Sequence, residues 1–263
     1  MTPSWLRCNE TSSCGYGRYR PNRVKHMLQN AFKKTYPPQT GLYAVKVKGG
    51  DDWKAHDACR LHISVGQPYH EGPKFAATMD WARARFKNVT VCVNDALQLG
   101  NFMFERGIDR HTAYIRAINE GGKWLERNAA SLEGVDIRRW ESWKTWPEYP
   151  LMLEAVLKTY AENKEFSAAI DRTAASFWDK RERLNPAYTP DRKDHFFELS
   201  KEYLLEEVAI ICRMIDQQRA IDLYPGTMLP VFDLMKGHDL PYAPKELGQR
   251  DFARIDFLKR NIG

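Results

Sequence analysis

The sequence of 263 residues lacks features that would define several common classes of protein. No apolar stretch approaches the roughly 20 residues that a membrane-spanning helix needs, and the first residues lack the apolar core of a secretory signal. The five cysteines are odd in number and scattered, which indicates neither a disulfide framework nor a zinc site. Gly-x-Gly-x-x-Gly, Gly-x-x-x-x-Gly-Lys and Lys-Met-Ser-Lys-Ser segments are also missing. We expect a soluble, cytoplasmic protein that works without a metal or a cofactor.

Acidic residues are almost absent from the first fifty positions. This segment has nine Lys and Arg residues against Glu10 alone, a net charge of +8. The whole chain carries +6, so the remaining 213 residues carry −2. A basic arm on a nearly neutral body predicts a polyanionic partner, most simply a nucleic acid. A solvated arm without a partner is the alternative.

The order of the patterns predicts one domain of the α/β class, over residues 42–263, behind a basic N-terminal arm over residues 1–41. Residues 42–48 alternate as a strand does, and residues 59–65 and 89–93 are short apolar runs typical of buried parallel strands. Residues 131–140 are a weaker strand candidate. Helices are predicted near residues 22–34, 73–86, 96–105, 109–127, 151–163, 165–181, 194–220 and 249–259. Strands alternating with helices indicate a parallel sheet with helices on both faces.

The first candidate for chemistry is Ser64, at the end of a predicted buried strand. Ligand chemistry in open α/β sheets takes place outside the carboxyl ends of the strands. Ser64 is therefore placed as a nucleophile would be, and Gly66 would let backbone N–H groups approach an oxyanion. The alternative is a serine that only ends a strand by hydrogen-bonding its own turn.

The second candidate is the pair Tyr203 and Glu207, four residues apart on one face of the long helix predicted at residues 194–220. That face continues as an apolar stripe, so Glu207 is expected to point inward. Glu206 is expected on the solvent side, with Glu202 and Arg213. Burial raises the pKa of a carboxyl group and suits it to proton exchange with an amine. A glutamate paired with an unseen arginine is the alternative.

These two segments and three others follow one another in the order found in cyclodipeptide synthases. They are Ser64 with Gly66, the strand end at residues 91–95, Trp140-x-x-Trp143, Tyr203-x-x-x-Glu207 and Tyr224-Pro225. The resemblance runs from about residue 42 to the C-terminus and leaves only the basic arm outside.

Two positions indicate which branch of that family the chain resembles. Gln67 stands where one branch carries Asn, and Pro225 stands where that branch carries His, so the chain resembles the other branch, called XYP. His62, two residues before the serine, replaces a Gly that is frequent in the better-known branch.

The resemblance implies a Rossmann-like domain similar to the catalytic domain of class I (tyrosyl- and tryptophanyl-type) aminoacyl-tRNA synthetases. It implies a monomer that joins two aminoacyl groups from aminoacyl-tRNAs into a 2,5-diketopiperazine without ATP. By analogy Ser64 carries the acyl group, Tyr203 and Glu207 hold and deprotonate the amine, and Tyr224 relays protons.

Four further positions match the substrate pocket of the family: Arg60, Gly66, Gln67 and Asp222. Arg60 and Asp222 stand where relatives line the first aminoacyl pocket, which leads to the hypothesis of a polar or charged first amino acid.

A stripe of basic residues supports a tRNA partner independently of the motifs. Arg116, Lys123 and Arg127 fall on one side of the helix predicted at residues 109–127, and Arg106 and Arg110 would extend the patch. The opposite side carries Ala113, Ile118 and Leu125. Members of the family bind tRNA phosphates with a basic helix in this region. Because phosphate contacts carry no sequence information, they allow many tRNAs to bind. The alternative is a solvated basic face.

Two other functions stay open at this point. An esterase or aminoacyl hydrolase built on Ser64 should show a Gly-x-Ser-x-Gly turn with a late Asp and His, and neither pattern surrounds this serine. A non-catalytic tRNA-binding module would keep the basic stripe without needing the inward Tyr203 and Glu207.

Overall fold

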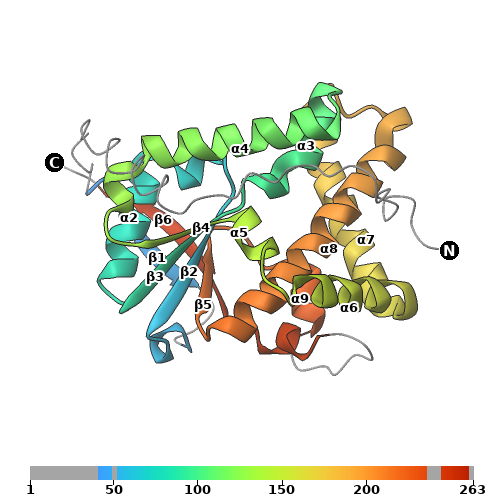
Figure 1. The fold of residues 1–263 in the computed structure, drawn as a ribbon. Helices are drawn as coiled ribbons and strands as arrows, with labels where there is room; N and C mark the ends of the chain where they lie inside the picture. The colour runs from blue at the N-terminus through green and yellow to red at the C-terminus, as the bar shows by residue number, and fades with distance from the viewer. Residues whose placement is uncertain (1–40, 49–51, 236–243, 261–263) are drawn as a thin grey trace. The chain divides into compact units, whose positions relative to one another are not determined.

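In the computed structural model, residues 41–48, 52–235 and 244–260 are described, and the predicted arm and its helix at 22–34 lie outside them. The described chain forms one six-stranded sheet in the order β1-β6-β5-β2-β3-β4 (Figure 1). Every neighbouring pair is parallel except β1 with β6. The strands are β1 (Tyr43–Lys48), β2 (Ala58–Ile63), β3 (Asn88–Val93), β4 (Asp136–Arg139), β5 (Ile221–Tyr224) and β6 (Phe252–Lys259). The predicted α/β class with a largely parallel sheet is confirmed.

Helices connect the strands, and several of them pack against one another beside the sheet. They are α2 (Gly72–Arg83), α3 (Leu99–Arg106), α4 (Arg110–Arg127), α5 (Trp140–Lys144), α6 (Tyr149–Glu162), α7 (Lys164–Glu182), α8 (Lys193–Gln217) and α9 (Pro230–Met235). Short 3-10 turns complete the connections, among them η4 (Ala96–Gln98). None of the helices in the described ranges has the length and apolar character to cross a bilayer.

The two faces of the central strands differ in chemistry. Side chains alternate along a strand, and one set, which includes Leu61 and Leu223, packs in an apolar core with α2 and α4. The alternate set points toward α8 and includes Arg60 and Asp222, both almost fully buried. Because Arg60 stands opposite Asp222 in the β2–β5 pairing, the same alternation brings Ser64 and Tyr224 to the α8 side.

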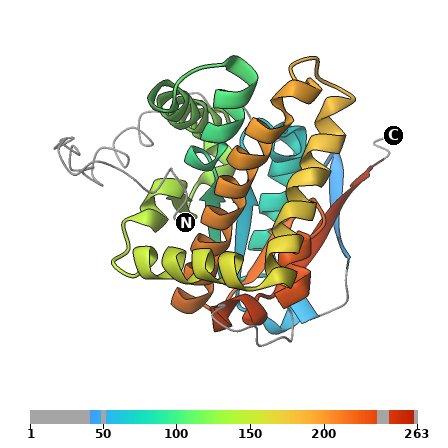
Figure 2. The ribbon, with the colours of Figure 1, turned by 90° about the vertical axis from the view of Figure 1, so that its right-hand side faces the viewer.

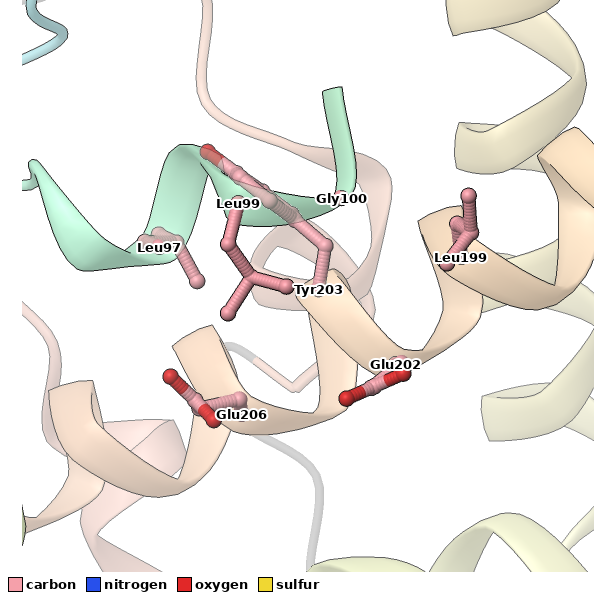
Figure 3. Close-up of a pocket in the computed structure, with 7 residues that line it drawn as sticks. All are labelled: Leu97, Leu99, Gly100, Leu199, Glu202, Tyr203 and Glu206. Atoms are coloured by element: carbon pink, nitrogen blue, oxygen red, sulfur yellow. The ribbon is translucent and has the colours of Figure 1, made fainter. Parts of the chain in front are cut away.

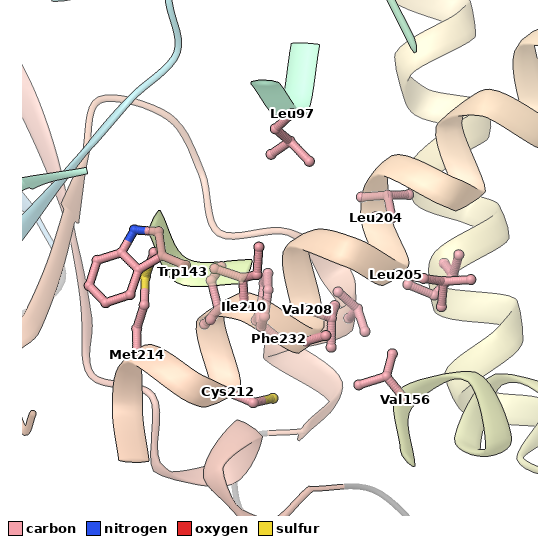
Figure 4. Packing of buried hydrophobic residues seen from close by; sticks show 14 of the residues in the cluster. Leu97, Trp143, Val156, Leu204, Leu205, Val208, Ile210, Cys212, Met214 and Phe232 are labelled. Atoms are coloured by element: carbon pink, nitrogen blue, oxygen red, sulfur yellow. The ribbon is translucent and has the colours of Figure 1, made fainter. Parts of the chain in front are cut away.

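The second apolar core holds α8 in place. Its residues come mainly from α8, α6, α7 and α9, with Trp143 of α5 (Figure 4). Leu204, Val208 and Ile210 of α8 are completely buried in this core. Figure 2 shows α6 lying across the neighbouring α7 and α8. A long helix packed on several sides is a rigid support, so the side chains that α8 presents to the sheet are fixed in position.

A close contact brings α4 over the end of β3. Asp95, two residues after the end of β3, is fully buried and accepts hydrogen bonds from Arg139 Nε (2.6 Å) and Ala96 N (2.8 Å). A side chain at Gly121 of α4 would collide with the Asp95 carboxylate. The glycine inside this helix is therefore required by the approach of the helix to Asp95.

The C-terminal part of the sequence differs from the prediction. Residues 249–259 were predicted as a helix, and the structure instead has strand β6, which pairs with both β1 and β5. The inward side chains of Ala253 and Ile255 alternate with more exposed ones, the period of a strand. Strand β5 was missed altogether, because four residues with a charged Asp222 carry no recognisable pattern.

Candidate active site

Ser64 lies directly after β2, at the carboxyl end of the sheet. Its backbone N–H donates to His70 Nδ1 at 2.9 Å. Gly66 follows with a φ of +87°, a conformation that side chains disfavour, and Gln67 N closes the turn on Ser64 O at 3.2 Å. The turn presents the serine hydroxyl at the strand end, where ligands bind in open α/β sheets.

Three hydroxyl groups form a chain at this point. Ser64 Oγ is hydrogen-bonded to the Tyr224 hydroxyl at 3.0 Å, and that hydroxyl is bonded to the Tyr69 hydroxyl at 2.9 Å. Burial, with the neighbouring Tyr224, raises the pKa of Tyr69 far above its usual range. Tyr69 therefore keeps its proton and can donate a hydrogen bond to Tyr224, and with that donor the hydrogen of Tyr224 is directed toward Ser64.

His70 holds the turn at Ser64 in place through its ring and its backbone, and has no role in proton transfer. Burial lowers its pKa to about 3, so the ring is neutral. Its Nδ1 accepts from Ser64 N, and its carbonyl oxygen accepts from Trp124 Nε1 of α4 at 2.8 Å. The histidine thus ties the serine turn to α4.

A cavity of about 270 Å³ lies beside the serine. Ser64, Tyr224 and Tyr203 line it together with Gln67, so the structure brings three of the four predicted catalytic residues to one space. Figure 3 shows the Tyr203 ring projecting from α8 toward Leu99 and Gly100. Burial, with the nearby Glu207 carboxyl, raises the pKa of Tyr203 well above its usual value, so Tyr203 stays a phenol.

The two adjacent glutamates of α8 have different surroundings. Glu207 Oε2 is buried and has no hydrogen-bond partner within the described part of the chain. Burial raises the pKa of Glu207 to about 7, although the charge of Arg250 opposes the shift. Glu207 does not line the 270 Å³ cavity but lies one helical turn after Tyr203, which does.

The expectation that Glu206 faces solvent is wrong. Its carboxylate accepts from Trp140 Nε1 at 2.6 Å and pairs with Lys144 Nζ at 3.2 Å. The side chain is only 19% exposed, and Arg213, expected on the same solvent side, is 8% exposed. Helix α5 covers this side of α8, which sequence periodicity on α8 alone cannot show. Of the two carboxyl groups, only Glu207 is left without a fixed partner.

Arg60 and Asp222 form a buried ionic cluster. Asp222 Oδ1 accepts from Arg60 Nε at 2.7 Å, and Oδ2 accepts from Arg250 Nε at 2.7 Å. His62 Nε2 lies 3.1 Å from Oδ1. Burial alone would raise the pKa of Asp222, but the surrounding positive charges hold it well below its usual range.

Neither Arg60 nor Asp222 is among the residues that line the cavity. The guanidinium of Arg60 also donates to the carbonyl oxygens of Met214, Gln218 and Ala220, so it has almost no donor left for a substrate. The hypothesis of a polar first amino acid, which depended on these two residues, therefore receives no support from their placement.

The basic residues predicted to meet tRNA are all exposed. They lie on α4 or at the end of α3, two helices that Figure 1 labels. Most of them have an acidic or aromatic neighbour: Arg110 pairs with Glu202, Lys123 with Glu120, Arg127 with Glu71, and Arg116 lies over the Phe102 ring. Ala113 and Leu125 of the opposite side are buried as expected.

Sequence reasoning missed three residues that line the cavity, Tyr69, Lys180 and Arg181. It also missed His70, which contacts Ser64 but does not line the cavity. Tyr69 and His70 follow Ser64 within six residues, so a loop rich in polar side chains after a predicted nucleophile was the available signal. Lys180 and Arg181 lie more than 110 positions away from Ser64, and no local pattern connects them to it.

No family model matches the chain, and a search of curated proteins gives no match. Solved structures do match. A CDPS (cyclodipeptide synthase) from Fluoribacter dumoffii has 26% sequence identity and a TM-score of 0.72, over 83% of this chain and 100% of that one. A cyclodipeptide synthase from Candidatus Glomeribacter gigasporarum bound to Phe-tRNAPhe has 20% identity and a TM-score of 0.59, over 78% and 89%.

A third likeness concerns the fold. A protein of Mycobacterium tuberculosis has 10% identity and a TM-score of 0.61, over 84% of this chain and 94% of that one. Its structure is described as demonstrating that cyclodipeptide synthetases are related to type I tRNA synthetases. This likeness agrees with the α/β fold expected from the sequence. In fold, and in the order of the motifs around Ser64, the chain is similar to these cyclodipeptide synthases.

Proposed function

We propose that the chain is a tRNA-dependent cyclodipeptide synthase of the XYP branch, which works as a monomer in the cytoplasm. It takes two aminoacyl-tRNAs and forms a 2,5-diketopiperazine through acyl groups held on Ser64, without ATP. The observation that carries this proposal is the hydrogen bond between Ser64 Oγ and Tyr224 in a cavity that Tyr203 also lines. The cyclodipeptide synthases of similar fold support it.

The first step exchanges one ester for another. Ser64 Oγ attacks the ester carbonyl of the first aminoacyl-tRNA, and the bond to the ribose 3′ oxygen breaks. The serine proton goes to that oxygen, so the released tRNA ends in a hydroxyl group. The ester of an aminoacyl-tRNA is already activated, so the exchange consumes no nucleotide.

The second step needs a neutral amine on the acyl-enzyme. An ammonium group cannot attack the second ester, so a nearby base must take its proton. Glu207 suits this role because its carboxyl is buried, lacks a fixed partner and has a pKa near 7. Tyr203, one turn earlier and always protonated, would hold the amine by a hydrogen bond. The amine then forms a peptide bond, and the second tRNA leaves with a free 3′ hydroxyl.

The third step closes the ring. The free amine of the dipeptidyl group attacks the Ser64 ester, and Ser64 Oγ leaves with a proton. Tyr224 is placed to relay that proton from the attacking amine, because its hydroxyl is hydrogen-bonded to Ser64 Oγ at 3.0 Å and to the Tyr69 hydroxyl at 2.9 Å. A cavity of about 270 Å³ favours the tethered amine over water by proximity.

Replacing Tyr69 with Phe should slow ring closure by about 5-fold, the worth of one hydrogen bond of about 1 kcal/mol. Without Tyr69 the hydrogen of Tyr224 is no longer directed at Ser64. The dipeptidyl-enzyme should then accumulate, visible by intact-protein mass spectrometry. Tyr160→Phe, which removes a hydroxyl bonded to exposed Asp171, is the matched control. Equal rates in the two variants would contradict the relay.

The proposal is tested by mixing the protein with aminoacyl-tRNAs, quenching with acid and measuring the intact mass. The wild type should gain one aminoacyl group, and Ser64→Ala should gain none. A protein that binds tRNA equally well in both forms and gains no mass would be a binding module. A wild type that releases only free amino acids would be a hydrolase.

The partner in this proposal is tRNA, which binds to the exposed basic stripe of α4. Arg116, Lys123 and Arg127 would contact phosphates, with Arg106 and Arg110 at one end. A structural neighbour of similar fold was solved bound to Phe-tRNAPhe, which supports this partner.

A further inference from the structure

The cavity beside Ser64 has a basic wall that the acyl-transfer steps do not use. Lys180 and Arg181, in the last turn of α7, line the same cavity as Ser64 and Tyr224. Lys180 is exposed and Arg181 is half-buried, so this wall lies where the cavity reaches solvent. The proposed roles of Ser64, Tyr203, Glu207 and Tyr224 need no cation there.

Arg181 is held in a fixed orientation. One of its terminal nitrogens, Nη1, donates to Asn101 Oδ1 at 3.0 Å, and Asn101 lines the cavity as well. The guanidinium carbon lies 5.9 Å from the Tyr188 ring centre and 5.7 Å from that of Phe196. Across the described ranges, no carboxylate forms an ion pair with Arg181 or Lys180. An oriented guanidinium without an acidic partner is suited to binding a phosphate or carboxylate.

The anion follows from the proposed function, on which this inference rests. A cavity of about 270 Å³ is slightly below the usual range for small-molecule sites, roughly 300–1,000 Å³. It has room for an aminoacyl ester and part of a ribose, and the rest of a tRNA must lie outside. One phosphodiester joins that terminal nucleoside to the tRNA, so its phosphate would lie near the cavity mouth.

We propose that Arg181, with Lys180, forms a subsite for the 5′-phosphate of the terminal adenosine of aminoacyl-tRNA. Every acceptor end carries this phosphate, whatever its amino acid, so the subsite positions the ester against Ser64 without selecting the side chain. Its residues lie on α7, whereas the basic stripe lies on α4 and at the end of α3.

The test compares two fragments of the same aminoacyl-tRNA, one with and one without that phosphate. They are 3′-aminoacyl-adenosine 5′-phosphate and 3′-aminoacyl-adenosine, and the readout is the rate of acylation of Ser64. In the wild type the phosphate should raise kcat/KM for acylation roughly 10-fold or more, as expected for a hydrogen bond to a charged group. Arg181→Gln should remove this advantage and leave the phosphate-free fragment unchanged.

Two further variants isolate the charge at this position. Arg181→Lys should keep part of the phosphate advantage. Arg172→Gln removes an exposed arginine of α7 that does not line the cavity, and it should keep all of the advantage.

Three outcomes would overturn the inference. The first is a wild type in which the phosphate gives no advantage. The second is an Arg181→Gln protein that is slowed equally with both fragments, which would show that Arg181 only supports Asn101. No acylation of the wild type by intact aminoacyl-tRNA would refute the proposed function and the subsite with it, a result distinct from the other two.

Discussion

Replacing Glu207 with Gln should reduce diketopiperazine formation at least about 100-fold, the usual minimum effect of losing a general base. The change removes a buried carboxyl group of α8 that has a pKa of about 7 and whose Oε2 has no hydrogen-bond partner. Acylation of Ser64 by the first aminoacyl-tRNA should continue, because that step needs no base at Glu207. In the wild type, peptide formation should rise with pH through about 7, and this rise should be absent from the variant.

The same substitution should stabilise the protein at pH 8. The pKa of Glu207 is about 7 in the folded state, against an ordinary 4.5. The folded state therefore binds the proton more tightly, and ionisation costs stability as the pH rises from 4.5 to 7. Above pH 7 the cost is complete, on the order of 3 kcal/mol at 1.36 kcal/mol per pKa unit. Glutamine avoids this cost, so the two proteins should differ at pH 8 and approach one another at pH 4.5.

Thermal unfolding from pH 4.5 to 8 measures this difference. Glu206→Gln is the matched control, since its carboxylate is paired with Lys144 and bonded to Trp140 and its loss offers no gain in stability. A Glu207→Gln protein that is less stable than the wild type at pH 8, or that makes product at the wild-type rate, would contradict the role given to Glu207.

Replacing Asp222 with Ala should have the largest effect on stability. The carboxylate is fully buried and pairs with Arg60 and Arg250, which are themselves almost fully buried. Its removal leaves two positive charges without a counter-charge in the interior, which typically costs about 3–5 kcal/mol. For a chain of this size the melting temperature should fall by roughly 6–20 °C.

The loss should also reach the active site. Asp222 lies in β5 two residues before Tyr224, so a strand weakened at Asp222 no longer places that hydroxyl against Ser64. Asp57→Ala is the control, because Asp57 pairs with Lys87 on the surface, where both side chains are more than 70% exposed, and it should cost less than about 1 kcal/mol. Equal melting temperatures for the two variants would contradict the buried cluster.

Local pattern was sufficient for the elements that position the nucleophile. The apolar runs at residues 59–65 and 89–93 are strands β2 and β3, and they pair in parallel as expected. The helix predicted at 109–127 is α4, with Asp109 accepting from Thr112 N as its N-terminal cap. These elements depend on periodicity and on capping, both of which are visible in a single sequence.

The missing parts depend on pairing between distant segments. In residues 249–259, Phe252 and Ile255 fit a helix as well as Ala253 and Ile255 fit a strand, and only the neighbours β1 and β5 decide between them. Glu206 likewise depends on Trp140, 66 positions away. The motifs of the family predicted that Ser64, Tyr203 and Tyr224 would lie together, while their hydrogen bonds and burial required the structure.

The central claim is that Ser64 carries acyl groups into a cyclic dipeptide. It is tested most directly by mass spectrometry of medium from cells that express the wild type or Ser64→Ala, with both proteins shown to be folded. The account predicts new diketopiperazine masses with the wild type, which also identify both amino acids, and none with Ser64→Ala. No such product from the wild type with intact aminoacyl-tRNA pools, or equal product from both proteins, would contradict it.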